Sequence, residues 1–306
     1  MKIYNNLNLN KRFKHSVIAI GNFDGIHLGH QKVLKQAKQK AKKNKIPLGL
    51  ISFEPMPVMF FNQKIKNHRI NSLDQKKNQL KKLKLDFILL IKFNKKFSFI
   101  SAEKFIKNII FEKLRSKYVF VSKNFKFGKD RKGNINTLKK FQNTYGYKTI
   151  ITPPFKKAKK IISSTLIRKK IQLGNIAETN KLLNRSWTIE GKVIKGSRRG
   201  RKIGFPTCNI KLNNYTIPKL GVYSVMVEIG QIKKKGIANL GYRPTFNGQS
   251  LLLEVNIFGI NKNLYNKIIK VSFIRFIRPE KRFKNLEQLK KQIKIDINLA
   301  KKNVQR

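Results

Sequence analysis

Short apolar runs alternate with helical patterns over the chain up to about residue 184. The runs occupy residues 17–20, 48–53, 87–91, 118–121 and 149–152. Two intervening segments carry apolar residues at helical spacing, namely Val33, Leu34, Ala37 and Ala41, and then Phe105, Ile106, Ile109, Ile110 and Leu114. Short strands separated by helices favour a parallel sheet, because parallel strands need long crossover connections. We therefore expect a doubly wound parallel α/β domain.

The second part of the chain has a different pattern. Strand-like segments at 187–194, 221–229, 235–242, 250–258 and 267–277 are separated by Gly, Pro and Asn, with no helical pattern between them. In 221–229, Tyr223, Val225, Val227 and Ile229 point one way, and Ser224 and Glu228 point the other way. This pattern predicts an antiparallel β-barrel, followed by a terminal helix with the stripe Leu286, Leu289, Ile293 and Ile297. We expect two domains, 1–184 and 185–306.

The formal net charge of +56 is extreme and raises the possibility of a nucleic-acid partner. The positive residues are mostly Lys and are scattered along the whole chain, whereas a dedicated binding stripe would be richer in Arg and interleaved with aromatic residues. We therefore expect no specific nucleic-acid partner, and we keep a basic nucleic-acid-binding protein as the alternative from another class.

The single cysteine, Cys208, excludes an intrachain disulfide and a thiolate metal cluster. The apolar runs are too short to cross a bilayer, and the first residues lack the apolar core of a signal peptide. We expect a cytoplasmic protein without a membrane partner. The sequence leaves the oligomeric state open.

Residues 21–31, GNFDGIHLGHQ, join the first predicted strand to a helix. Ligands of doubly wound sheets bind at the carboxyl ends of strands, and the glycines and helix N–H groups of this turn suit an anion. A helix terminus contributes only about 0.3–1 kcal/mol, whereas an enzyme must lower a barrier by at least about 8 kcal/mol. His27 and His30 can supply further donors to phosphate oxygens. The simpler alternative is that a histidine at a helix start only caps the helix.

Two other segments can bind anions. Ser163, Ser164 and Thr165 can cap a helix that carries Arg168 one turn later, although capping alone is the commoner role of such hydroxyls. In 195–210, KGSRRGRKIGFPTCNI, a loop rich in Gly and Arg can present N–H groups and cations to phosphates. Thr207 and Asn209 share one face of an extended segment there, and their oxygens suit Mg²⁺. An ordinary basic hairpin is the alternative for this loop.

These motifs carry a family resemblance. GNFDG followed by HLGH (27–30) resembles the HxGH signature of nucleotidylyltransferases, and the longer string resembles the bacterial bifunctional riboflavin kinase/FMN adenylyltransferases, or FAD synthetases. Further segments similar to that family lie at 53–57, 69–73, 124–133, 162–168, 206–209, 241–246, 253–258 and 277–283. The resemblance covers essentially the whole chain.

For the first domain, the resemblance implies transfer of AMP from ATP to FMN, with release of pyrophosphate. His27 and His30 would hold the ATP phosphates and stabilise the transition state without a covalent intermediate. The other expected binding residues are Gly21, Phe23, Asp24, Gly29, Asn124, Arg131, Ser163, Ser164, Thr165 and Arg168. Met56, Ser122 and Leu166 stand where the family usually has His, Gly and Arg, and the last change removes a cation from the expected phosphate site.

For the second domain, the resemblance implies a riboflavin kinase. Glu254 would be the catalytic base for the ribityl 5′-hydroxyl, Thr207 and Asn209 would hold Mg²⁺, and Cys208 would be a small packed residue. The other expected binding residues are Gly196, Lys202, Gly204, Phe205, Pro206 and Arg278. Asn256, Gly259 and Asn266 depart from the usual His, Asp and Gly of this region.

The leading hypothesis is one chain with two active sites. Riboflavin and ATP would give FMN, and FMN and ATP would give FAD, with Mg²⁺ at both sites. A nearer alternative is an adenylyltransferase for another phosphorylated acceptor, which would leave the predicted barrel and PTCN (206–209) unexplained.

Overall fold

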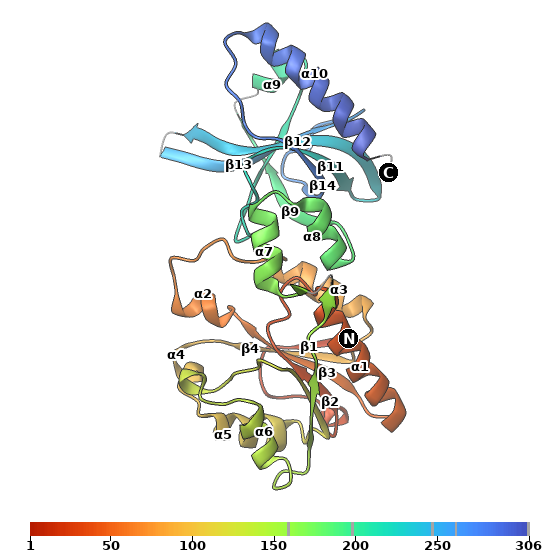
Figure 1. Ribbon diagram of the computed structural model, residues 1–306, viewed down its shortest axis with the longest axis vertical. Coiled ribbons are helices and arrows are strands. Elements are labelled where there is room, and N and C mark those ends of the chain that lie inside the picture. Colours follow the sequence, from red (N-terminus) through yellow and green to blue (C-terminus); the bar gives the residue numbers. More distant parts are fainter. Residues whose placement is uncertain (158–159, 197–198, 246–247, 261, 305–306) are drawn as a thin grey trace. The chain divides into compact units, whose positions relative to one another are not determined.

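The computed structural model describes residues 1–157, 160–196, 199–245, 248–260 and 262–304 (Figure 1). The chain divides into two compact units, Met1–Lys66 with Leu73–Ser163, and Asn67–Ser72 with Ser164–Arg306. Ser197 and Arg198 of the predicted phosphate loop lie outside the described residues, as does Phe246 of the segment 241–246. No helix in the described ranges is long and apolar enough to span a membrane.

A six-stranded parallel sheet forms the centre of the first unit, in the order β1-β4-β3-β2-β5-β6. Its strands are β1 (Lys2–Tyr4), β2 (Val17–Ile20), β3 (Leu48–Glu54), β4 (Phe87–Lys92), β5 (Tyr118–Ser122) and β6 (Lys148–Thr152). A short antiparallel pair, β7 (Lys156–Lys157) and β8 (Lys160–Ile161), follows. The predicted parallel sheet is confirmed. The edge strand β1 was not predicted, because its three residues contain no apolar run.

Both faces of this sheet are covered, since alternate strand residues belong to two separate cores. Ile18 and Ile20 pack in one core, whereas Val17 and Ala19 pack in the other. Helices α5 (Ala102–Phe105), η2 (Ile106–Lys113, a π-helix) and α6 (Ile135–Phe141) cover the first face, and α1 (Leu28–Asn44) and α3 (Leu73–Lys82) cover the second. The apolar residues predicted for both helical segments are buried. Burial on both faces explains why the strands are continuously apolar.

The remaining helical pieces of the first unit are short. They are η1 (Lys11–Phe13), α2 (Pro57–Phe61), α4 (Lys95–Ser98) and η3 (Lys129–Arg131).

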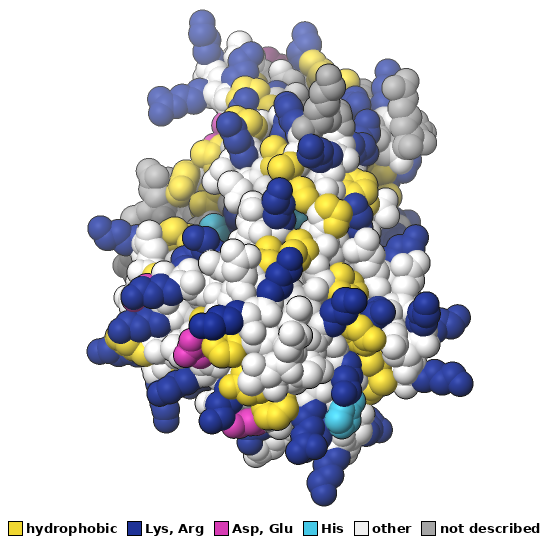
Figure 2. Space-filling model, turned by 60° about the horizontal axis from the view of Figure 1, so that its bottom comes forward, with side chains coloured by type: hydrophobic (Ala, Val, Ile, Leu, Met, Phe, Trp, Pro, Cys, Tyr) yellow, Lys and Arg dark blue, Asp and Glu magenta, His cyan; other side chains and the backbone are white. Residues whose placement is uncertain are grey.

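On the face seen in Figure 2, Lys and Arg side chains are spread widely rather than gathered in one stripe. This view fits the even distribution of Lys along the sequence.

A closed antiparallel barrel forms the centre of the second unit, in the order β10-β13-β12-β11-β14-β9. Its strands are β9 (Trp187–Ile194), β10 (Cys208–Lys211), β11 (Gly221–Ile229), β12 (Ile232–Thr245), β13 (Gly248–Ile257) and β14 (Ile268–Arg278). Its helices are α7 (Ser164–Gln172), α8 (Ile176–Leu183), α9 (Arg199–Lys202) and α10 (Leu286–Asn303). The predicted barrel and terminal helix are confirmed, and the extended segment after the phosphate loop is a sixth strand, β10.

The terminal helix α10 covers part of the outer face of the barrel (Figure 1). Tyr223 and Ser224 lie on opposite faces of β11 and both are buried. Asn303 of α10 donates a hydrogen bond to the Ser224 hydroxyl. Leu286, the first residue of the predicted stripe, is 51% exposed, so only the later residues of that stripe pack inward.

The segment Asn67–Ser72 belongs to the second unit although the chain on both sides of it belongs to the first. The indole N–H of Trp187 donates to the carbonyl of Ile70 at 2.8 Å, and the hydroxyl of Thr216 donates to the carbonyl of His68 at 3.1 Å. Trp187 and Thr216 are both buried. These buried hydrogen bonds attach the segment to the start of β9 and to the connection between β10 and β11.

We predict that Thr216→Val lowers the stability of the second unit by about 0.5–1.5 kcal/mol, because it removes one buried hydrogen bond and keeps the shape of the side chain. Trp187 is the only tryptophan of the chain, so its fluorescence during urea unfolding reports this unit. Thr144→Val, at an exposed position of the first unit, is the control and should leave the midpoint nearly unchanged. Equal midpoints for all three proteins would contradict the prediction.

Candidate active sites

The first site lies at the point where the order of the parallel strands reverses. Strand β2 lies between β3 and β5, and the chain runs from β2 to β3 on one side and returns to β5 on the other. The carboxyl ends of two such strands form the ligand crevice of doubly wound sheets. The turn 21–27 follows β2, and Asn124 follows β5, so both lie at this edge.

The turn after β2 has an unusual backbone. Phe23, Gly25 and Ile26 all have positive φ angles, of 48°, 81° and 40°. For residues other than glycine this conformation costs about 1–3 kcal/mol, and such strain is concentrated at functional sites. A side chain on Gly29 would begin 3.1 Å from the ring atoms Cε1 and Nδ1 of His27. Gly29 therefore leaves the room that the His27 ring occupies.

The two histidines lie together at the start of α1. Their rings stack with centroids 3.7 Å apart, and Phe23 packs against His30 with centroids 4.8 Å apart. His27 is only 4% exposed, and its Nδ1 accepts a hydrogen bond from the backbone N–H of His30 at 3.4 Å. Because Nδ1 is an acceptor, the proton of a neutral His27 lies on Nε2. His27 thus caps the helix and also keeps a donor at Nε2.

The other residues predicted for the first site fall into two groups. Asn124 and Arg131 are exposed residues of the first unit, and Ser163 is its last residue. Ser164 and Thr165 begin α7 in the second unit, where Arg168 donates from Nε to the carbonyl of His68 at 2.8 Å. Their phosphate-binding roles stay predictions, and the Arg168 contact is a structural one that the sequence did not reveal.

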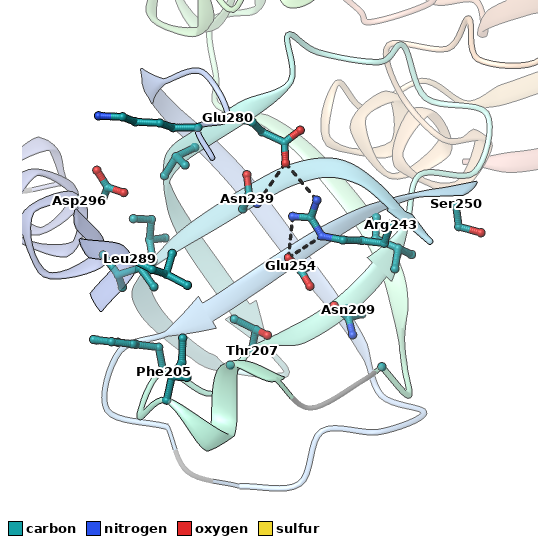
Figure 3. A pocket seen from close by; sticks show the side chains of 18 of the residues that line it. Phe205, Thr207, Asn209, Asn239, Arg243, Ser250, Glu254, Glu280, Leu289 and Asp296 are labelled. Atoms are coloured by element: carbon teal, nitrogen blue, oxygen red, sulfur yellow. Dashed lines mark hydrogen bonds and ion pairs between the residues drawn. The ribbon is translucent and has the colours of Figure 1, made fainter. Parts of the chain in front are cut away.

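The second site is built on three neighbouring strands of the barrel. Glu254 of β13 lies directly opposite Asn209 of β10 on one side and opposite Asn239 of β12 on the other. Residues opposite one another in an antiparallel sheet project from the same face. All three line a cavity of about 790 Å³ that α10 borders with Leu289 and Ile293 (Figure 3).

Six of the residues predicted for this site line the cavity, namely Gly196, Phe205, Thr207, Asn209, Glu254 and Arg278. Lys202, Gly204 and Pro206 are not among its lining residues. The carbonyl of Pro206 accepts a hydrogen bond from Asn256 Nδ2 at 2.6 Å. Asn256, which departs from the family pattern, therefore tethers the loop that carries Phe205 and Thr207.

The donor set of the cavity is rich in oxygen. The side-chain oxygens of Asn209 and Asn239 are buried and have no hydrogen-bond partner among the described residues. Thr207 lies on the same side of the segment as Asn209, and a side chain on Gly196 would overlap Asn209 Nδ2. Hydroxyl and amide oxygens are suitable ligands for Mg²⁺, which keeps several waters and phosphate oxygens as its other ligands. The residues present therefore fit a magnesium ion.

Glu254 is held by Arg243 of β12. The Nε and Nη2 atoms of Arg243 both donate to Glu254 Oε2, at 3.1 and 2.8 Å, and Nη1 donates to Glu280 Oε1 at 3.0 Å. Burial alone would lower the pKa of Arg243, but the hydrogen bonds and charges of Glu254 and Glu280 raise it above its ordinary value. Arg243 and Glu280 were not predicted as site residues, although both lie in segments that resemble the family.

Arg278 is paired with a carboxylate that was also not predicted. Its Nε contacts both oxygens of Asp296, at 3.1 and 3.0 Å, and its Nη2 donates to Oδ2 at 2.7 Å. Asp296 lies on α10 and is 2% exposed, and Gln292 donates to its Oδ1 at 2.9 Å. This pair ties the end of β14 to α10 at the border of the cavity.

Cys208 alternates with Thr207 and Asn209 along the extended segment, so its side chain points to the opposite face. Its Sγ donates to the carbonyl of Val255 at 3.5 Å, and burial raises the pKa of the thiol to about 11. A thiol with this pKa is roughly 0.1% thiolate at pH 8, whereas a free cysteine is roughly one quarter thiolate. These properties fit a packed residue.

We predict that Cys208 reacts with a small aromatic disulfide reagent at pH 8 at least about 100-fold more slowly in the folded protein than in urea, because the thiolate is the reactive form. The rate in the folded protein should rise with pH up to about 11. Cys208→Ala removes the single thiol and provides the blank. Equal rates with and without urea would contradict the assignment.

Comparison with known proteins agrees with this two-part architecture. The sequence model described as FAD synthetase matches residues 9–166, and the one described as riboflavin kinase matches residues 183–304. A bifunctional riboflavin kinase/FMN adenylyltransferase from Buchnera aphidicola subsp. Schizaphis graminum is 43% identical over 299 residues, which cover 96% of each chain. The protein of the same name from Haemophilus influenzae is 37% identical over 296 residues, again 96% of each chain.

Among solved structures, a crystal structure described as a macrolide-efflux protein from Streptococcus pneumoniae has a TM-score of 0.87 and 31% identity, and the match covers 98% of both chains. The full-length similarity to proteins whose name joins the two activities agrees with the division into two units. The chain belongs to the bifunctional riboflavin kinase/FMN adenylyltransferase family of flavin cofactor biosynthesis.

Proposed function

We propose that the two reactions of this family take place at the two sites described above, with riboflavin phosphorylation in domain 185–306 and adenylyl transfer to FMN in domain 1–184. The observation that carries the proposal is the row Asn209, Glu254 and Asn239 on one wall of a cavity, together with the stacked pair His27 and His30 at the switch point of a separate sheet. Riboflavin, FMN and ATP are the substrates that membership of the family supports. We place the enzyme in the cytoplasm.

In the kinase reaction, Glu254 accepts the proton of the ribityl 5′-hydroxyl as that oxygen attacks the γ-phosphorus of ATP. The new O–P bond forms as the bond between the γ-phosphorus and the β,γ-bridging oxygen breaks, so FMN and ADP are the products. Thr207 Oγ1 and Asn209 Oδ1 would hold Mg²⁺, which when bound neutralises charge on the phosphates of ATP. The two unpartnered amide oxygens beside Glu254 support this assignment.

Adenylyl transfer requires no side-chain base, because the attacking phosphate oxygen of FMN is already ionised. That oxygen bonds to the α-phosphorus of ATP, and the bond from this phosphorus to the α,β-bridging oxygen breaks to release pyrophosphate. The work left to the protein is to stabilise the charge that develops on the phosphates. His27 Nε2 and His30, at the N-terminus of α1, would donate hydrogen bonds to those oxygens.

A single assay tests both reactions. Purified protein is incubated with riboflavin, ATP and Mg²⁺, and chromatography separates riboflavin, FMN and FAD. We expect FMN first and FAD later. If neither product forms, the proposed function is wrong. An adenylyltransferase for another acceptor would leave riboflavin unchanged.

We predict that replacing both His27 and His30 by Ala stops FAD formation while FMN accumulates from riboflavin. The reason is that the pair supplies donors to the phosphates of ATP in one site only. His15→Asn is the matched control, since His15 is exposed and its positive φ angle suits Asn. Loss of both reactions in the double variant, with native stability, would contradict the two-site division.

We predict that Glu254→Gln lowers the rate of FMN formation by about 10²–10⁴-fold, because the amide cannot accept the hydroxyl proton. FAD formation from added FMN should remain normal in this variant. Glu287→Gln, at an exposed position on α10 that does not line the cavity, is the control. Normal riboflavin phosphorylation by Glu254→Gln would remove Glu254 from the role of base.

A further inference from the structure

The guanidinium of Arg243 lies between the carboxylates of Glu254 and Glu280 in the kinase cavity (Figure 3). We propose that Arg243 is a positioning residue that orients Glu254 for proton transfer, and that Glu280 holds Arg243 in place. This inference rests on the proposed function of Glu254 as the base. Neither Arg243 nor Glu280 needs to contact the substrate in this role.

The geometry of the Arg243 contact leaves half of the Glu254 carboxylate available. Both hydrogen bonds from Arg243 end on Oε2, and Oε1 has no hydrogen bond from any of the described residues. A base needs one open lone pair and a fixed direction toward the proton that it removes. Two hydrogen bonds to a single oxygen fix the carboxylate and leave Oε1 to accept the proton.

The neighbouring pair in the same cavity has the opposite geometry. Arg278 contacts both oxygens of Asp296, and Gln292 donates to the same carboxylate. Asp296 is therefore fully engaged and nearly inaccessible, as expected of a structural ion pair. This contrast indicates that the Arg278–Asp296 pair is structural, whereas Arg243 orients Glu254 and leaves one of its oxygens accessible.

The absence of a side chain at Gly241 leaves space for the carboxylate of Glu280. A side chain on Gly241 would overlap Glu280 Oε1 and would begin 2.6 Å from Arg243 Nη1. Asn239 Nδ2 donates to the same Glu280 oxygen at 3.4 Å. Glu280 thus binds the third nitrogen of Arg243, and the guanidinium cannot turn away from Glu254 without losing that contact.

The test compares Arg243→Met with the wild-type protein in both reactions. We expect kcat for riboflavin phosphorylation to fall by about 10- to 100-fold, the size found for partners that orient the ligands of a catalytic metal. The KM values for ATP and riboflavin should change by less than about threefold, because Arg243 acts through Glu254. FAD formation from added FMN should be unchanged, and a cooperative unfolding transition in Trp187 fluorescence shows that the second unit is folded.

Three further variants make the outcome decisive. Arg243→Lys should recover only part of kcat, because the lysine ammonium lacks the planar fork with which the guanidinium contacts both carboxylates. Glu280→Gln keeps Arg243 and should lower kcat by a smaller factor. Arg275→Met, on β14 and exposed, is the matched control and should leave both reactions unchanged.

The results separate this inference from the proposed function. If Glu254→Gln stops FMN formation but Arg243→Met and Glu280→Gln keep the wild-type kcat, only the inference is wrong. A rise in the KM for ATP with normal kcat would make Arg243 a nucleotide ligand and would also overturn it. If Arg243→Met is too unstable to assay, a wild-type kcat in both Arg243→Lys and Glu280→Gln shows that the inference is wrong. If wild-type protein makes no FMN, the proposed function itself fails.

Discussion

The pairing of β13 between β10 and β12 is the constraint on which the kinase site depends. It places a carboxylate between two amides, on the face of the barrel that α10 borders. A slip of one residue along β13 would exchange the two faces of the strand. Glu254 would then enter the apolar interior, and Leu253 or Val255 would take its place in the cavity. The buried interior of the barrel therefore fixes the register of β13, and the register determines which side chains face the cavity.

Periodicity predicted the parallel sheet, the barrel and the helix faces, because burial of apolar side chains repeats at a fixed spacing along the chain. The turn at His27 and His30 could also be predicted, since it depends on residues close in sequence. The Arg243–Glu280 pair could not, because its partners lie 37 residues apart and meet only after the barrel closes. The contact between Arg278 and Asp296 could not be predicted for the same reason.

The chemistry of the charged residues differs between surface and site. Lys dominates the positive charge of the chain, yet the two cations that bind carboxylates in the cavity are Arg243 and Arg278. Three of the fourteen acidic residues, Glu254, Glu280 and Asp296, line that one cavity. A planar fork with several donors can hold a carboxylate in one direction, whereas an ammonium on a flexible stem cannot. At these two positions an arginine holds a carboxylate in one direction.

The attachment of Asn67–Ser72 to the barrel has a consequence for the order in which the protein forms. Ile70 leaves the ribosome 117 residues before Trp187, the residue whose indole binds its carbonyl. At about 5–20 residues per second, this interval lasts roughly 6–23 seconds, far longer than a helix or a hairpin needs to form. During translation the first unit can therefore build its sheet around a segment that waits for a later part of the chain. A nascent chain halted before residue 187 would carry that segment without its indole partner.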